Sequence, residues 1–272
     1  MKTNKPTSIA IYAVLIFMLL IEIFPILVVI CSSFTPIDEI GKSFLFPKHW
    51  SIENIRVILF ESKFLRYMAN TIYIAVVISF GSMFINSLSA YAFARMRFPF
   101  RNTLFLILVA TLIIPGEVLI LPQFVMISDL KWIDTYWALI VPSLATSFGI
   151  FFMKQFFMGL PRDLEDAAFI DGCGWFKTYF TIMLPLVKAP LLTVTLLGFV
   201  GVWDSFLWPI TVINTPDKHM IQVAVSLLST EFFTNVGAQY ANVLLSSLPL
   251  VILFLFLQKQ YISGITAGSI KG

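Results

Sequence analysis

The chain has 272 residues, of which 58% are hydrophobic and 12% charged, and its formal net charge is +3. A soluble globular protein is typically about 45–50% apolar and about 25% charged. So few charges could not cover the surface of a water-soluble fold of this length, which excludes the soluble classes. The composition predicts an all-α membrane protein that crosses the bilayer several times.

Six apolar stretches are long enough to cross a bilayer, and we expect the whole chain, residues 1–272, to form a single transmembrane domain. The first stretch is too long for a secretory signal core, and no small-x-small cleavage site follows it. The third contains Pro115-Gly116-Glu117, which predicts a loosened helix, tolerated at membrane depth where neighbours or a cavity satisfy the backbone. The predicted spans cover residues 9–31, 68–94, 103–127, 135–153, 186–213 and 240–257.

The distribution of Lys and Arg predicts how these spans are oriented. Six spans place both termini on one side, and the segments of that side are richer in Lys and Arg than the opposite segments. Most basic residues of the opposite side lie in the long first loop, which has little weight in the positive-inside rule. We therefore expect a multi-pass protein of the cell membrane with both termini and the loop 158–185 in the cytoplasm. His49 and His219 then lie outside, without neighbours at ligand spacing, so no metal site is expected.

Three acidic residues, Glu22, Glu117 and Asp204, fall at or near membrane depth. Acids inside a membrane are costly and point to function, so a proton relay in a secondary transporter is one interpretation. The other is polar lining or placement at the interface, because no basic residue in mid-span pairs with them. No arrangement for nucleophilic catalysis is visible, and Gly41-Lys42-Ser43 lacks the earlier glycine and the strand of a phosphate-binding loop. The chain is predicted to be no enzyme, without an ATPase site or cofactor of its own.

Small and polar residues recur every four positions in the second predicted span, at Ser82, Asn86, Ala90 and Ala94. Such a stripe lets membrane helices approach closely, and packing is its simplest role. Asn86 could alternatively line a polar pathway. The residues predicted to line a translocation path are Asn86, Glu117, Gln123 and Asp204.

The most polar part of the chain is the run from Pro161 to Asp171, which carries five charges in eleven residues. We expect a helix of about two turns that begins just after Pro161, is capped by Asp163 and ends at a left-handed Gly172. Such a helix, with an apolar edge, suits docking to another protein. A solvated loop at the interface is the alternative. Leu184-Pro185 is expected to bend the following segment into the fifth span.

The spacing of this run resembles a known signature. Asp166-Ala167-Ala168, Gly172 and then Ile182-x-Leu184-Pro185 resemble the cytoplasmic loop of permease subunits of binding-protein-dependent ATP-binding-cassette importers. That signature begins Glu-Ala-Ala, so either Glu165 or Asp166 could be its leading acid here. Trp203 to Pro209 resembles the fifth-span motif of the carbohydrate-type branch, which usually has Asn where Asp204 stands. Gly264 to Gly272 is similar to the C-terminus of the maltose-type second permease subunit.

The resemblance implies a type I importer permease fold and import of a sugar, either an oligosaccharide, a disaccharide or a related polyol, by alternating access. It also implies a second homologous permease subunit, two ATP-binding-cassette ATPase subunits that bind ATP and Mg²⁺, and an extracytoplasmic solute-binding protein, in contact with lipid and not with nucleic acid. The implied ATPase-coupling residues are Glu165, Asp166, Ala167, Ala168, Asp171, Gly172 and Pro185, and the tail residues near the ATPase are Gly268, Lys271 and Gly272. A proton-coupled secondary transporter and a scaffolding membrane protein remain the alternatives.

Overall fold

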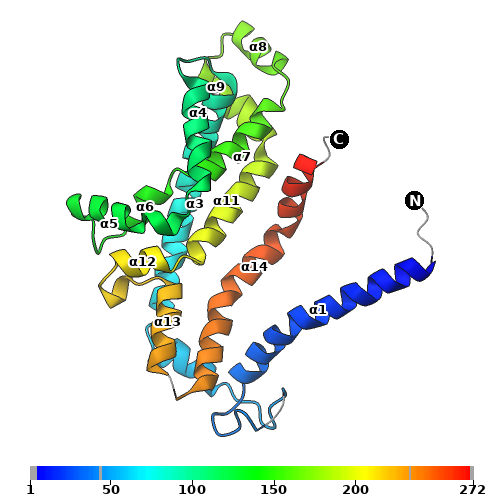
Figure 1. Ribbon diagram of the computed structural model, residues 1–272, viewed down its shortest axis with the longest axis vertical. Coiled ribbons are helices and arrows are strands. Elements are labelled where there is room, and N and C mark those ends of the chain that lie inside the picture. The colour runs from blue at the N-terminus through cyan, green and yellow to red at the C-terminus, as the bar shows by residue number, and fades with distance from the viewer. Residues whose placement is uncertain (1–4, 43–44, 233, 270–272) are drawn as a thin grey trace. The chain divides into compact units, whose positions relative to one another are not determined.

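The structure is a computed structural model that describes residues 5–42, 45–232 and 234–269 (Figure 1). Every regular element in these residues is a helix, which confirms the predicted all-α class. The chain divides into two compact units. One consists of Met1–Arg66 and Ala224–Pro249, and the other of Tyr67–Val223 and Leu250–Gly272.

The first unit contains α1 (Lys5–Ser33), α2 (Glu53–Arg56), the π-helical turn Val57–Glu61, most of α13 (Ile221–Glu231) and the start of α14 (Val236–Ser269). The end of α1 is held by Asn54, whose Nδ2 donates to the carbonyl oxygens of Ser33 at 3.2 Å and Thr35 at 2.8 Å. A Cβ at Gly237 would collide with this Nδ2, so glycine lets α14 approach Asn54 closely. These contacts satisfy carbonyl groups that a helix end otherwise leaves unpaired.

The second unit holds most of the long helix α3, Phe64–Arg95, and a series of shorter helices. The α-helices that follow are α4 (Arg101–Ala110), α5 (Ile120–Asp129), α6 (Trp137–Ser143), α7 (Ser147–Met158), α8 (Asp163–Ile170), α9 (Trp175–Thr178), α10 (Leu184–Leu186), α11 (Lys188–Trp203) and α12 (Leu207–Val212). Short 3-10 or π turns connect them at Thr111–Ile113 (η2), Gly116–Leu119 (η3), Tyr179–Met183 (η4) and Pro216–Lys218 (η5).

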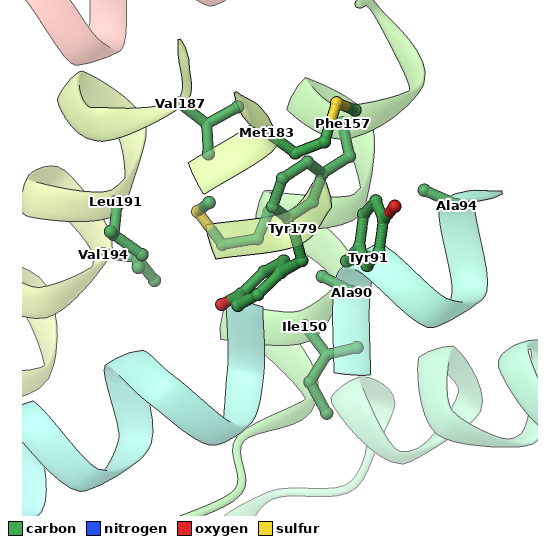
Figure 2. Packing of buried hydrophobic residues seen from close by; sticks show 11 residues of the cluster. Ala90, Tyr91, Ala94, Ile150, Phe157, Tyr179, Met183, Val187, Leu191 and Val194 are labelled. Atoms are coloured by element: carbon green, nitrogen blue, oxygen red, sulfur yellow. The ribbon is translucent and has the colours of Figure 1, made fainter. Parts of the chain in front are cut away.

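A core of the second unit forms where α3 packs against α7, η4 and α11 (Figure 2). Tyr179 is fully buried, and its ring centroid lies 5.3 Å from that of Tyr91. Its hydroxyl is hydrogen-bonded to Ser87 at 2.6 Å. Ala90 and Ala94 of the small-residue stripe belong to this core, so they permit the close helix contacts that the sequence predicted.

Within the described residues, four helical segments are long and apolar enough to cross a membrane as single spans: Ile11–Ser33, Phe64–Arg95, Trp137–Met158 and Val236–Phe256. Two further pairs are bent, Arg101–Ile113 with Gly116–Asp129 by 101° and Trp175–Leu186 with Lys188–Trp203 by 83°. Counting each bent pair as one span gives six. The first bend follows from Pro115, whose ring excludes a continuous helix through Thr111. The second lies at Val187, two residues after Pro185.

The predicted fifth range, 186–213, does not form one helix. α11 ends at Trp203 and α12 begins at Leu207, with Asp204, Ser205 and Phe206 between them. A helix that ran through Pro209 would bring the proline ring against the carbonyl of Ser205, four residues earlier. In the structure Pro209 instead lies in the first turn of α12, where a missing N–H has little cost.

Candidate functional site

The polar run folds as the two-turn helix α8, Asp163–Ile170. The predicted cap was wrong in detail, because Asp163 is the first helical residue and the capping position is Arg162, which makes no side-chain cap. Asp163 can still stabilise the helix start, since acids near an N-terminus interact favourably with the helix dipole. Gly172 ends the helix at φ 75°, which confirms the left-handed conformation expected there.

One face of α8 is buried and carries Glu165. The Glu165 Oε2 atom lies 3.5 Å from Arg95 Nε, at the end of α3, and the two side chains are only 7% and 4% exposed. Arg95 also donates from Nη2 to the carbonyl oxygen of Leu160 at 2.6 Å. The Tyr91 hydroxyl faces the same carboxylate. Arg95 therefore anchors both the loop before α8 and α8 itself.

The opposite face of α8 is exposed and mixes acidic with apolar side chains. Asp163, Asp166 and Ala167 are exposed, as is Asp171 directly after the helix, and Ile170 is 86% exposed. The Phe169 ring packs edge-on against Trp175 of α9, with 4.7 Å between ring centroids, and this contact holds the helix from its other end. α8 thus presents a firmly held surface with three carboxylates around an apolar centre.

A cavity of about 330 Å³ lies within the second unit, bordered by α3, α6, α11 and α12. Its walls are mostly apolar, with the polar side chains of Ser82, Asn86, Ser143, Thr146 and Ser205 among them. A cavity of this size, with mostly apolar walls and a few polar groups, is typical of sites that bind small molecules.

Asn86 organises this cavity. Its Nδ2 donates to Thr146 Oγ1 at 3.0 Å and its Oδ1 accepts from the Thr146 backbone N–H at 2.9 Å. Thr146 lies in the break between α6 and α7, so Asn86 satisfies irregular backbone that would be costly at membrane depth. A Cβ at Gly149 would lie 2.5 Å from Asn86 Nδ2, so only glycine fits there without displacing the amide.

The remaining path and coupling candidates lie apart from this cavity. Glu117 and Asp204 are exposed and Gln123 is half-buried, and none of the three is among the residues that line it. Pro185 is exposed in α10. Gly268 lies in the last turns of α14, whereas Lys271 and Gly272 lie outside the described residues.

Sequence reasoning missed a second charged cluster, around Asp134. This carboxylate accepts bonds from the backbone N–H groups of Asn214 at 3.0 Å and Thr215 at 2.9 Å, from Thr215 Oγ1 at 2.6 Å, and from Lys218 Nζ at 3.0 Å. The bond from the Thr215 hydroxyl, supported by the Thr215 and Asn214 amides and by Lys218, holds the pKa of Asp134 well below its usual range. The cluster ties the turn before α6 to the segment after α12. Among the described residues, no group of three His, Cys, Asp or Glu side chains could hold a metal ion.

Comparison with known proteins places the chain among transporter subunits. Residues 85–266 match the family of binding-protein-dependent transport system inner membrane components. The chain is 34% identical over 261 residues to the arabinooligosaccharides transport system permease protein AraQ of Halalkalibacterium halodurans, with 94% of each chain covered. It is 31% identical to the galactooligosaccharides transport system permease protein GanQ of Bacillus subtilis, with 96% of this chain and 94% of the relative covered.

A solved structure with the same fold is a bacterial ABC transporter involved in the import of the acidic polysaccharide alginate. The TM-score is 0.85 at 22% sequence identity, covering 95% of this chain and 98% of that chain. This likeness confirms the predicted importer permease fold. Because the family match extends over most of the chain, the signature around α8 is no isolated coincidence. The chain belongs to the binding-protein-dependent transport system inner membrane components.

Proposed function

We propose that this chain is a permease subunit of an ATP-driven importer that carries an oligosaccharide or a related sugar into the cytoplasm. It would work with a second permease subunit, two ATPase subunits and an external solute-binding protein, and would hold no ATPase site of its own. The names of its relatives support a sugar as the cargo. The proposal keeps the predicted orientation, with both termini and α8 in the cytoplasm.

The observation that carries this proposal is the division of α8 into two faces. A helix that transmits force must be fixed to its own subunit and still present a complementary surface to a partner. Glu165 meets the first need through Arg95, and Asp166 and Ile170 meet the second. We therefore assign the contact with the ATPase to Asp166, and the internal anchor to Glu165.

The cavity at Asn86 fits a place on the translocation path. Hydroxyl and amide groups of Ser143, Thr146 and Asn86 can exchange hydrogen bonds with sugar hydroxyls, and Phe148 and Trp208 supply apolar ring surface. Alternating access by rocking of helix bundles would expose such a cavity first to one side and then to the other. A proton relay has less support, because Glu117 and Asp204 are exposed and do not line the cavity.

Copurification and transport test the function directly. The chain, expressed with its partner permease and ATPase, should form one complex that takes up sugar in an ATP-dependent manner. A panel of arabino- and galacto-oligosaccharides, screened for a rise in the melting temperature of the cognate binding protein, would identify the cargo. Uptake by the isolated chain in a proton gradient, without ATP, would overturn the proposal.

Charge reversal at α8 tests the coupling assignment. Asp166→Arg should abolish sugar uptake and weaken copurification of the ATPase, while the protein remains in the membrane at normal abundance. Asp129→Asn, an exposed acid outside α8, serves as the control and should leave uptake unchanged. Normal uptake by Asp166→Arg at normal abundance would remove Asp166 from the coupling surface.

A further inference from the structure

A second pocket, of about 520 Å³, lies where α3 ends and α4 begins. Four arginines line it, Arg95, Arg97, Arg101 and Arg162, and no acidic residue does. They come from the end of α3, the turn after it, the start of α4 and the residue before α8. The fold therefore brings positive charge from two separate stretches of the second unit, residues 95–101 and Arg162, to one point.

Most of this charge is not compensated within the described part of the chain. Arg95 is paired with Glu165. Arg101 donates only to neutral oxygens, to Met96 O at 3.0 Å and to Asn102 Oδ1 at 3.4 Å. Arg97 and Arg162 are exposed, and neither forms an ion pair with a described residue. Glu165 and Asp166 line an adjacent pocket, together with Arg95, Arg97 and Arg162.

The start of α4 adds to the attraction for an anion. The residue before this ten-residue helix, Phe100, has φ 59° and provides no side-chain cap. Asn102 and Thr103 lie in the first turn and line the pocket. An uncapped helix N-terminus with free amides binds phosphate groups readily, and guanidinium groups match the geometry of phosphate oxygens.

The surroundings distinguish a lipid from a free anion. The pocket lies at the ends of two segments that are apolar enough to span a membrane, which is the depth of lipid headgroups. Beside it, the Phe100 side chain is 77% exposed, and Leu104 and Ile107 continue the exposed apolar surface along α4 at 48% and 58%. Residues spaced by three and four lie on one helix face, so this surface can follow an acyl chain. A free phosphate ion would make no use of it.

We propose that Arg97, Arg101 and Arg162 bind the phosphate of an anionic phospholipid whose acyl chains lie along α4. Basic pockets at the membrane surface, between helix ends, are suited to such headgroups. Because Arg162 immediately precedes α8, the bound lipid would also fix the start of that helix to the bilayer. The proposal requires α3 and α4 to lie in the membrane, but it does not depend on the cargo.

The test compares lipids on the complete transporter complex. Phosphatidylglycerol added to phosphatidylcholine nanodiscs should raise the melting temperature of the wild-type complex, and native mass spectrometry should detect retained phosphatidylglycerol. The double variant Arg97→Gln/Arg162→Gln removes two exposed arginines and should lose both the shift and most of the retained lipid. Lys188→Gln, another exposed cation, which does not line the pocket, is the matched control and should keep both.

Two outcomes would overturn the proposal. Equal retention of phosphatidylglycerol by the wild type and the double variant would show that the arginines do not bind it. Equal protection by inorganic phosphate in phosphatidylcholine alone would show that the pocket takes free anions. The single variant Arg97→Gln keeps the test interpretable if the double variant fails to assemble, since it should lower lipid retention in the same direction. Sugar uptake is not a readout, so failure here leaves the proposed transport function untouched.

Discussion

Two carboxylates of the second unit, Glu165 and Asp134, are held in opposite ways. The Glu165 side chain is 7% exposed and has Arg95 as its ion-pair partner at 3.5 Å. Asp134 is 28% exposed, yet four hydrogen bonds reach its two oxygens. The more buried group is thus the less completely bonded. Among the described residues, Glu165 Oε1, Arg95 Nε and Tyr91 Oη find no hydrogen-bond partner of good geometry.

The two carboxylates therefore hold their segments by different means, Asp134 by several hydrogen bonds and Glu165 by one buried ion pair. The bonds around Asp134 are complete, so any movement of that turn breaks several of them at once. The bonds around Glu165 are few, so α8 is held mainly by this one buried ion pair and by the contact of Phe169 with Trp175. Loss of one contact should therefore loosen α8 more than loss of one bond loosens the turn at Asp134.

Removal of the buried acid should have the largest effect. Glu165→Ala leaves Arg95 as an uncompensated buried charge, which typically costs about 3–5 kcal/mol. We expect a large fall in the melting temperature of the detergent-solubilised protein, because α8 loses its attachment to Arg95. Asp166→Ala, on the exposed face one residue away, should change stability by less than about 0.5 kcal/mol.

The double variant Glu165→Met/Arg95→Met sharpens this result. Apolar replacement of both members of a buried pair is often neutral, so much of the lost stability should return. If Glu165→Ala proves as mild as Asp166→Ala, Glu165 is no anchor and the contrast with Asp134 disappears.

Neutralisation of Asp134 should have a smaller effect. Asp134→Asn removes the charge that binds Lys218 and turns an amide group toward hydrogen-bond donors. The substitution should lower the free energy of unfolding by about 1–3 kcal/mol. Asparagine tolerates the left-handed backbone at φ 61°, so strain does not confuse the measurement. Asp129→Asn is the control, and should leave the melting temperature nearly unchanged.

The same group should make stability depend on pH in a defined direction. The pKa of Asp134 in the folded protein lies below its ordinary value, which in an unfolded chain is about 3.9. Its contribution is therefore complete above that value and is lost as the pH falls through the lower folded pKa. The difference in melting temperature between wild type and Asp134→Asn should be constant from pH 7 to pH 5 and shrink below pH 4. A difference that grows in acid would contradict the hydrogen-bonding arrangement.

Local signals explain what could be predicted from the sequence. Pro161 and Gly172 mark the two ends of α8 because each restricts the backbone at its own position. The apolar runs identify the spans because the bilayer favours apolar residues along the whole length of a span. The two faces of α8 could not be assigned, since the choice between Glu165 and Asp166 depends on Arg95, which another helix supplies.

The Asp134 cluster was missed for the same reason. Its partner Asn214 lies 80 residues further along the chain, and no local sequence pattern around Asp134 indicates the pairing. The break in the predicted fifth span is different, because Pro209 was a visible local signal. The apolar residues on either side of Pro209 nevertheless make the whole range hydrophobic enough to be predicted as one span.

The smallest expected effect tests the end of α8 alone. At φ 75°, Gly172 has a backbone conformation that residues with a Cβ adopt at a cost, and a Cβ there would meet no atom within 4 Å. Gly172→Ala should therefore lower the free energy of unfolding by about 1 kcal/mol, through backbone strain alone. Gly174→Ala is a close control, since its surroundings are equally open but its φ is −81°. We expect Gly174→Ala to melt at or above the temperature of the wild type, and Gly172→Ala to melt below it. If both variants match wild type, α8 ends without help from the left-handed glycine, and the helix is held by Glu165 and Phe169 alone.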